Sequence, residues 1–114
     1  MREQDILSRW DETLALLEAY EPLLSPAQKE VLNLYFRFNL SLSEIAEERG
    51  TSRTAIFDAI RKGVAKLNDF ESKLRLAEHN AALDEAILTL TNASTLEEAQ
   101  SVLPQLRSLR SEEE

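Results

Sequence analysis

The sequence predicts an all-α fold, and three observations support this. Only two of the 114 residues are glycine and three are proline, whereas a β-rich chain of this length needs many turn residues. Leu, Ala and Glu, which favour helices, are abundant. Apolar residues also recur at spacings of three and four along much of the chain. With 43% apolar content the chain can bury one core, so we expect a single helical domain over residues 1–114.

The first expected helix is amphipathic and lies near the N-terminus. Its apolar positions recur at roughly helical spacing, and Pro22 limits the run. The stripe consists of Ile6, Trp10, Leu14, Leu17 and Leu24. Because Trp10 lies within this stripe, we interpret it as an anchor in the core or at an interface.

A second helix is predicted from Pro26 to about Arg37. Ser25 is a preferred N-cap residue, Pro26 suits the first helical position and Gln28 completes a capping box. Its apolar residues, expected to form the scaffold beneath the next two helices, are Val31, Leu32, Leu34, Tyr35 and Phe36.

A short third helix is predicted to begin after Ser41. Ser41 and Glu44 have the spacing of a capping box, in which each side chain bonds the other residue's backbone amide. Ile45 and Ala46 are expected to face the core, and the small Ala46 permits a close helix crossing. Gly50 stands where the helix must stop and the chain turn through positive φ.

A fourth helix is predicted to start at Ser52, another preferred N-cap residue, with Ile56 and Ile60 on one inward stripe. Together the two short helices predict a helix-turn-helix, with a core over residues 25–67. The alternative is an ordinary helical hairpin in which the glycine is only a C-cap. Arg49 and Thr51 occupy positions beside the turn that are often aliphatic, which predicts a less tightly packed turn.

The fourth helix is expected to continue without a break into a helical extension over residues 68–110. One seam runs through Ile56, Ile60, Gly63, Leu67, Phe70, Leu74, Ala77 and Ala81. A second stripe on another face consists of Leu76, Leu83, Ile87 and Leu90. Two stripes favour a homodimer through this helix. The alternative is that other helices of the same chain cover both.

A polar break over residues 91–94 precedes a last expected helix. Thr95 and Glu98 repeat the capping-box spacing, and Pro104 is expected to kink or restart the helix. Residues 111–114 are expected to form a frayed acidic tail.

The charge distribution singles out one segment. The net charge is −8, which argues against indiscriminate nucleic-acid binding. Residues 1–51 carry five basic and ten acidic residues, and residues 76–114 carry two and eight. Residues 52–75 carry six and three, a net charge of +3. The fourth helix is therefore the expected electrostatic footprint, although an ordinary solvated face would carry a similar charge.

Several classes of protein are disfavoured. Without cysteine there is neither a disulfide framework nor a thiolate metal site. No apolar run is long enough for a membrane span and the first residues are unlike a signal peptide, so we expect a cytoplasmic protein. His79 is the single histidine, and no nucleophile with a matching base or phosphate-binding glycine loop is evident. We therefore expect neither an enzyme nor a bound cofactor.

The candidate nucleic-acid contacts lie on the fourth helix. They are Ser52, Arg53, Thr54, Phe57, Asp58, Arg61, Lys62 and Lys66. Arg53 and Thr54 suit phosphates at a helix N-terminus, and an arginine could also read guanine. Phe57 could touch a thymine methyl and Asp58 could accept from cytosine, but Asp58 would also repel phosphates. A protein partner would tolerate that pair better, and packing within the protein or at a protein interface is favoured for Phe57.

The sequence resembles region four of bacterial sigma factors. The resemblance rests on Leu24-Ser25-Pro26, on Val31, Leu32, Leu34 and Tyr35, and on Leu42-Ser43-Glu44-Ile45-Ala46-Glu47. Within that superfamily it resembles the YlxM family more closely, through Leu42 to Glu48, Ser52-Arg53, Ala55-Ile56-Phe57-Asp58 and the segment from Leu67 to Leu74. The resemblance covers roughly residues 14–90.

The YlxM resemblance implies a DNA-binding protein associated with the signal recognition particle pathway. Three hypotheses follow. The first is a dimeric helix-turn-helix regulator that binds DNA. The second is an adaptor that uses the same fold to bind a protein, such as a targeting GTPase. The third is a protein that binds the RNA of the signal recognition particle.

Overall fold

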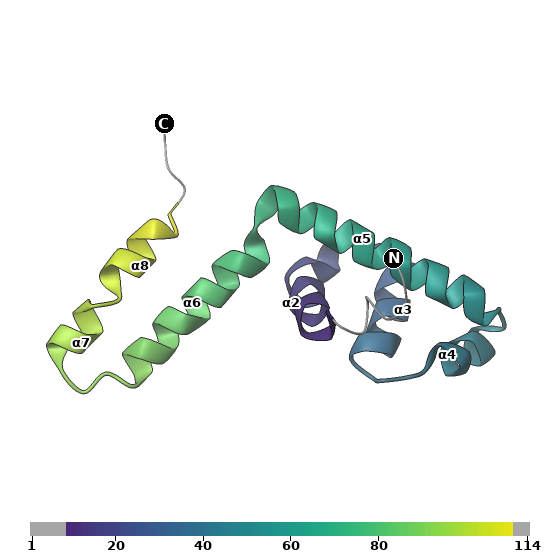
Figure 1. Cartoon of the computed structure of the whole chain (residues 1–114), viewed down its shortest axis with the longest axis horizontal. Coiled ribbons are helices and arrows are strands. Elements are labelled where there is room, and N and C mark those ends of the chain that lie inside the picture. Colours follow the sequence, from purple (N-terminus) through teal and green to yellow (C-terminus); the bar gives the residue numbers. More distant parts are fainter. Residues whose placement is uncertain (1–8, 111–114) are drawn as a thin grey trace. The chain divides into compact units, whose positions relative to one another are not determined.

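The computed structural model describes residues 9–110 and shows an all-α protein, as predicted (Figure 1). The helices in this range are α2 (Trp10–Tyr20), a 3₁₀ turn η1 (Glu21–Leu23), α3 (Pro26–Phe36), α4 (Leu42–Arg49), α5 (Arg53–Leu74), α6 (Leu76–Thr91), α7 (Leu96–Gln100) and α8 (Leu103–Ser108). Ile6 and the predicted acidic tail lie outside the described residues.

The chain divides into two compact units between Leu74 and Arg75. The first contains α2 to α5 and the second contains α6 to α8. The predicted boundary at residues 67 and 68 precedes this division by seven residues.

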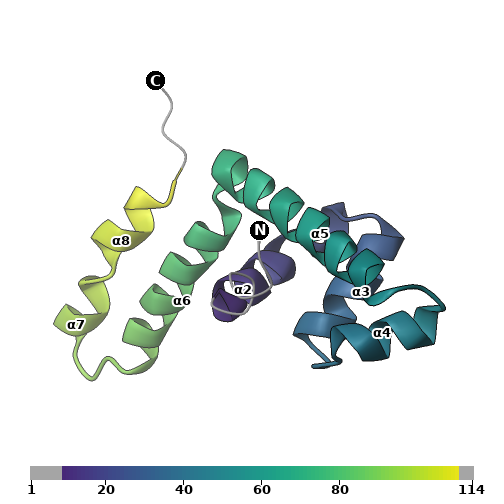
Figure 2. The same cartoon turned by 45° about the vertical axis from the view of Figure 1, so that its right-hand side comes forward.

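In the first unit, α5 packs across α2, α3 and α4, an arrangement visible in both Figure 1 and Figure 2. Apolar side chains from all four helices form its core. The most completely buried large ones are Leu17, Tyr20, Leu32, Phe36, Ile45, Ile60 and Leu67. Because α5 contributes to this core along most of its length, the scaffold fixes which of its faces points outward.

The predicted helix of residues 26–37 is confirmed as α3. Ser25 Oγ accepts a hydrogen bond from the Gln28 amide at 3.2 Å, and the Ser25 amide donates to Gln28 Oε1 at 3.4 Å. This completes the predicted capping box with Pro26 in the first turn. Val31, Leu32, Tyr35 and Phe36 are buried, whereas Leu34 is only partly buried.

Trp10 and Gly63 show how closely the helices of this unit approach. The Trp10 ring lies 5.3 Å from that of Tyr35 and 4.9 Å from that of Phe36, which confirms Trp10 as an anchor of the packing. A Cβ atom on Gly63 would lie 2.9 Å from Leu32 Cδ1, closer than atoms normally pack. Glycine at this position therefore allows α5 to pack closely on α3.

The prediction of one uninterrupted helix beyond residue 74 was wrong. α5 ends at Leu74, and Arg75 adopts a left-handed conformation with φ +52° before α6 begins. The last fully buried position of α5 is Leu67, Phe70 is half-buried against Tyr20, and Leu74 is exposed. Beyond Leu67 the apolar row of α5 has fewer side chains of the first unit to pack against. Extending α5 past Leu74 would therefore bury no further apolar surface in that unit.

In the second unit, α6 packs against α7 and α8, which lie beside it in Figure 1. Ala86 and Val102 are its two most buried side chains. The predicted cap of the last helical segment is present, since Thr95 Oγ1 accepts from the Glu98 amide at 3.1 Å. As predicted, this segment is interrupted before Pro104, which lies in the first turn of α8.

Candidate nucleic-acid interface

The predicted turn between α4 and α5 has the geometry of a helix-turn-helix. At the start of α4, the Glu44 amide donates to Ser41 Oγ at 3.0 Å and the Ser41 amide donates to Glu44 Oε1 at 2.8 Å. Gly50 ends α4 with φ +67° and ψ +37°, the left-handed state predicted for it. The Ala55 amide then donates to Ser52 Oγ at 3.0 Å, so Ser52 caps the first turn of α5.

The core contacts of α5 decide which face of the helix is outward. Ile56, Ile60, Val64 and Leu67 are buried against the scaffold. Residues three and four apart share a helix face, so the opposite face contains Thr54, Asp58, Arg61 and Lys62. The Thr54 and Lys62 side chains are exposed, and those of Asp58 and Arg61 are partly exposed. All four belong to the candidate contacts predicted from the sequence.

An ion-pair cluster occupies the middle of this outward face. Asp58 Oδ1 lies 2.6 Å from Arg61 Nη2, and Asp58 Oδ2 lies 3.1 Å from Lys62 Nζ. The hydrogen bond from Arg61, followed by that from Lys62, lowers the pKa of the Asp58 carboxyl below its ordinary value. A negative charge therefore sits between two of the cations that the sequence proposes as phosphate contacts.

The remaining candidate residues surround this cluster. Ser52 and Arg53 are exposed at the start of α5, and Lys66 is exposed one turn beyond Lys62. Phe57 is half-buried at the edge of the outward face. The structure thus brings the eight candidates onto the turn and the first four turns of one helix, but it turns Phe57 partly toward the protein.

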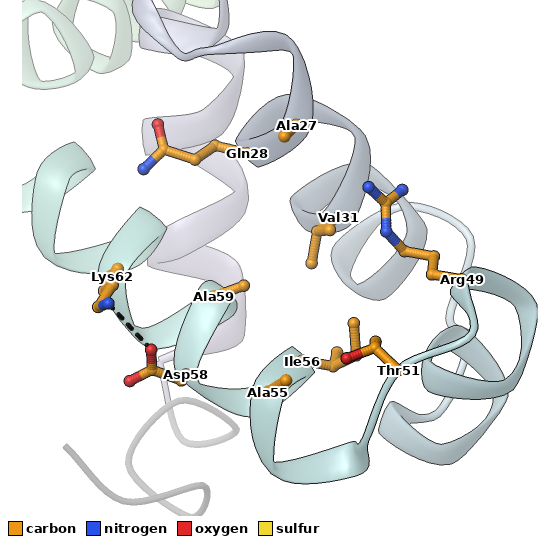
Figure 3. A pocket seen from close by; sticks show the side chains of 10 residues that line it. All are labelled: Ala27, Gln28, Val31, Arg49, Thr51, Ala55, Ile56, Asp58, Ala59 and Lys62. Atoms are coloured by element: carbon orange, nitrogen blue, oxygen red, sulfur yellow. Dashed lines mark ion pairs between the residues drawn. The ribbon is translucent and has the colours of Figure 1, made fainter.

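A groove of about 350 Å³ adjoins the outward face of α5, between that helix and α3 (Figure 3). Small and apolar side chains line its floor, and polar side chains surround it. The floor consists of Ala27 and Val31 from α3 with Ala55, Ile56 and Ala59 from α5. The polar residues are Gln28, Arg49, Thr51, Asp58 and Lys62.

Arg49 and Thr51 explain why the groove remains open. The Arg49 guanidinium forms an ion pair with Glu30 of α3, on the outside of the molecule, so its side chain does not fill the space beside the turn. Thr51 is exposed at the rim. This agrees with the prediction of a loosely packed turn. The groove itself was missed from the sequence, although Ala55 and Ala59, four residues apart, were its one available sign.

The comparison with protein families identifies the chain. A family model described as "Putative helix-turn-helix protein, YlxM / p13 like" matches residues 7–105. The chain belongs to this family, UPF0122. The match spans both structural units, and the description names a helix-turn-helix protein and not an enzyme.

Curated relatives of the family share substantial identity with this UPF0122 chain. The UPF0122 protein FN1394 of Fusobacterium nucleatum is 40% identical over 101 residues, which cover 89% of this chain and 98% of the relative. The UPF0122 protein NT01CX_2214 of Clostridium novyi is 46% identical over 71 residues, 62% of each chain. The UPF0122 protein ABC2295 of Shouchella clausii is 33% identical over 98 residues, 82% and 90% of the two chains.

The helices and the acidic side chains of residues 9–110 bear on two other kinds of site, a membrane span and a metal site. None of the helices there combines the length and the apolar character needed to cross a membrane. Within the same range, no three His, Asp or Glu side chains are grouped so that they could hold a metal ion.

Proposed function

We propose that this UPF0122 protein binds nucleic acid through the outward face of α5 and acts as a regulator. The observation that carries the proposal is the helix-turn-helix, in which a capped α4 and a left-handed Gly50 lead into a helix whose outward face is at least partly exposed and carries two cations and one carboxylate. The family description supports the same class of function. A helix presented in this way can enter the major groove of DNA with its N-terminal residues leading.

The charges on α5 support a division of roles. Arg53 lies at the N-terminus of the helix, where the backbone amides and the helix dipole also favour phosphate. Arg61, Lys62 and Lys66 follow within four turns, at positions suited to the phosphate backbone. We propose Thr54 and Asp58 as the side chains nearest the base edges, since both lie on the most outward line of the helix.

The test is a salt-titrated fluorescence anisotropy measurement with purified protein. Arg53→Ala and Arg61→Ala should each weaken binding and reduce the dependence of log K on log[salt] by about 0.9 for each lost phosphate contact. Lys73→Ala is the matched control, because Lys73 is a cation of the same helix that lies seven residues beyond Lys66. Unchanged affinity in both arginine variants would overturn the proposed docking.

The same titration distinguishes DNA from RNA. The resemblance to YlxM suggests a role in the signal recognition particle pathway, so the two probes are duplex DNA from the protein's own operon and the RNA of the particle. We propose DNA as the ligand. Salt-resistant affinity for the particle RNA alone, at physiological ionic strength, would replace DNA by RNA as the partner.

The groove favours a second candidate function, a protein-binding adaptor. Its apolar floor adjoins the outward face of α5, where Asp58 would oppose phosphates but not a protein surface. Under this hypothesis a targeting GTPase is the partner, and Ala59→Arg should abolish its binding by filling the groove. If Ala59→Arg keeps its nucleic-acid affinity but loses partner binding, the groove, and not the outward helix face, is the binding site for the protein partner.

A further inference from the structure

The groove between α3 and α5 has the size and composition of a small-molecule site. Its floor includes Val31 and Ile56, which are buried, and the half-buried Ala59. Its volume of about 350 Å³ lies at the lower end of the range of roughly 300–1,000 Å³ found for ligand pockets. Such pockets are mostly apolar and carry a few polar groups that orient the ligand. The groove therefore fits a compact ligand with an apolar body.

Charged side chains lie at both ends of the groove. In Figure 3 the Asp58 and Lys62 side chains lie on one side of the apolar floor, and Arg49 and Thr51 lie on the other. Each end therefore carries a cation, and a ligand that lies over the floor can place a charged group beside one of them.

The charge balance of the groove favours an anion over a cation. Among the described residues that line it, Arg49 and Lys62 are cationic and Asp58 is the one carboxylate. Asp58 also accepts a hydrogen bond at 2.6 Å from Arg61, which does not belong to the lining. Because Arg61 offsets the charge of Asp58 from outside the groove, the two lining cations leave a positive balance inside it.

Both lining cations have hydrogen-bond donors to offer a ligand. The Lys62 ammonium carries three N–H donors, and its ion pair with Asp58 Oδ2, at 3.1 Å, needs one of them. The Arg49 guanidinium carries five, and its ion pair with Glu30 is made through Nη1. Ionised acidic groups accept strong hydrogen bonds from such donors. The groove thus combines an apolar floor with donors for an acidic group.

We propose that this groove binds a small organic anion with an apolar body, and that the bound anion competes with nucleic acid for Lys62. The apolar body would lie over the floor and the acidic group would accept from Lys62 Nζ. Inorganic phosphate and the nucleic-acid backbone lack an apolar body that matches the floor. The inference rests on the first proposed function, nucleic-acid binding by α5, and it assigns the groove to the regulation of that binding.

The size of the regulatory effect follows from the loss of one phosphate contact. One contact changes the affinity for DNA by about eightfold at 0.1 M salt. A saturating anion should therefore weaken nucleic-acid binding by up to about eightfold and lower the salt slope by about 0.9. By thermodynamic reciprocity, nucleic acid should weaken anion binding by the same factor.

The first test uses the dye anilinonaphthalene sulfonate, in which aromatic rings supply the apolar body and a sulfonate supplies the anion. The dye is titrated into the full chain without nucleic acid, and its fluorescence gives the affinity. Ala59→Phe should fill the groove and weaken dye binding at least about tenfold. Ala65→Phe is the matched control, because Ala65 is an exposed alanine of the same helix that does not line the groove. Equal dye affinity of these two variants, both helical by circular dichroism, would overturn the site.

A lysine substitution tests the acidic group without filling the groove. Lys62→Gln should weaken binding of the sulfonate dye about fivefold and leave binding of N-phenylnaphthylamine, which has the same rings without the sulfonate, unchanged. Lys73→Gln is the control, because Lys73 pairs with Asp69 as Lys62 pairs with Asp58, but outside the groove. If Lys62→Gln weakens neither dye, or both equally, the anion is refuted and the groove is an apolar surface suited to a protein partner.

The second test adds the sulfonate dye to the nucleic-acid titration at about 0.1 M salt. Saturating dye should weaken nucleic-acid binding by the wild type but not by Lys62→Gln. Equal weakening of both proteins would overturn the competition for Lys62. If the wild type binds no nucleic acid at all, the proposed function and its regulation both fail, whereas the dye titrations without nucleic acid still decide whether the groove is an anion site.

Discussion

Replacing Asp58 by asparagine tests the electrostatics of the outward face most directly. Asparagine keeps the size of the side chain and removes its charge, so it leaves the helix geometry in place. Asp58 is paired with Arg61 at 2.6 Å and with Lys62 at 3.1 Å. If α5 binds phosphates, these two cations must be shared between the carboxylate and the nucleic acid. The substitution should therefore strengthen binding that does not depend on base sequence.

The size of this effect follows from the number of cations released. Each additional phosphate contact adds about 0.9 to the magnitude of the slope of log K against log[salt] on B-DNA. If affinity at 1 M salt is unchanged, one released cation strengthens binding roughly eightfold at 0.1 M salt, and two strengthen it roughly 60-fold. Asp58→Asn should thus bind about 8 to 60 times more tightly than the wild type at 0.1 M salt, with a slope steeper by about 0.9 to 1.8.

The assay is an anisotropy titration of both proteins on one random duplex and one operon duplex, at several salt concentrations. Asp69→Asn is the matched control, because Asp69 pairs with Lys73 on the same helix but beyond the candidate contacts. An unchanged slope for Asp58→Asn would refute the role of Arg61 and Lys62 as phosphate contacts. Tighter binding to random DNA combined with weaker binding to the operon would show instead that Asp58 also reads a base.

Three further predictions concern the first unit, whose unfolding in urea can be followed through the fluorescence of Trp10. Gly50→Ala should lower the free energy of unfolding by about 1 kcal/mol, because φ at this position is +67°. Gly50→Asn should lower it less, because asparagine adopts this left-handed conformation more readily than alanine. Equal effects of the two substitutions would contradict a purely backbone cause. Gly63→Ala should also destabilise, by roughly 1 kcal/mol, since overpacking against Leu32 exceeds the gain in helix propensity. A stabilised variant would show that Leu32 moves aside. The hydrogen bond from Asn33 is the main cause that lowers the pKa of the Glu21 carboxyl. The charged carboxylate therefore stabilises the fold above the unfolded pKa of about 4.3, and this stabilisation is lost as the pH falls through the lower folded pKa. Glu21→Gln should therefore lose less stability than the wild type between pH 5 and pH 3, and identical pH profiles would count against this account.

Local sequence signals predicted the elements of the first unit well. The caps at Ser25 and Ser41, and the left-handed Gly50, depend on hydrogen bonds and backbone preferences within a few residues. The inward stripe of α5 followed from its helical period, and with it the outward position of Thr54, Arg61 and Lys62. The spacing of Asp58 to Arg61 and Lys62 also permits the observed ion pairs, because residues three and four apart are neighbours on a helix.

Features that depend on contacts between distant residues could not be predicted in this way. The groove is lined by residues of α3 and α5 that lie more than 20 positions apart in the sequence, and Arg49 beside it pairs with Glu30 of α3, so no local pattern describes it. The break at Arg75 carries no glycine or proline, so the continuous seam predicted one helix where the structure has two. The sequence by itself determined the helices of the first unit up to the start of α5, the caps at Ser25 and Ser41, and the outward face of α5, because these depend on neighbouring residues. Only the tertiary structure decided where α5 stops, which residues open the groove and which face of α6 stays exposed, because those outcomes depend on whether another helix is present to bury each apolar side chain.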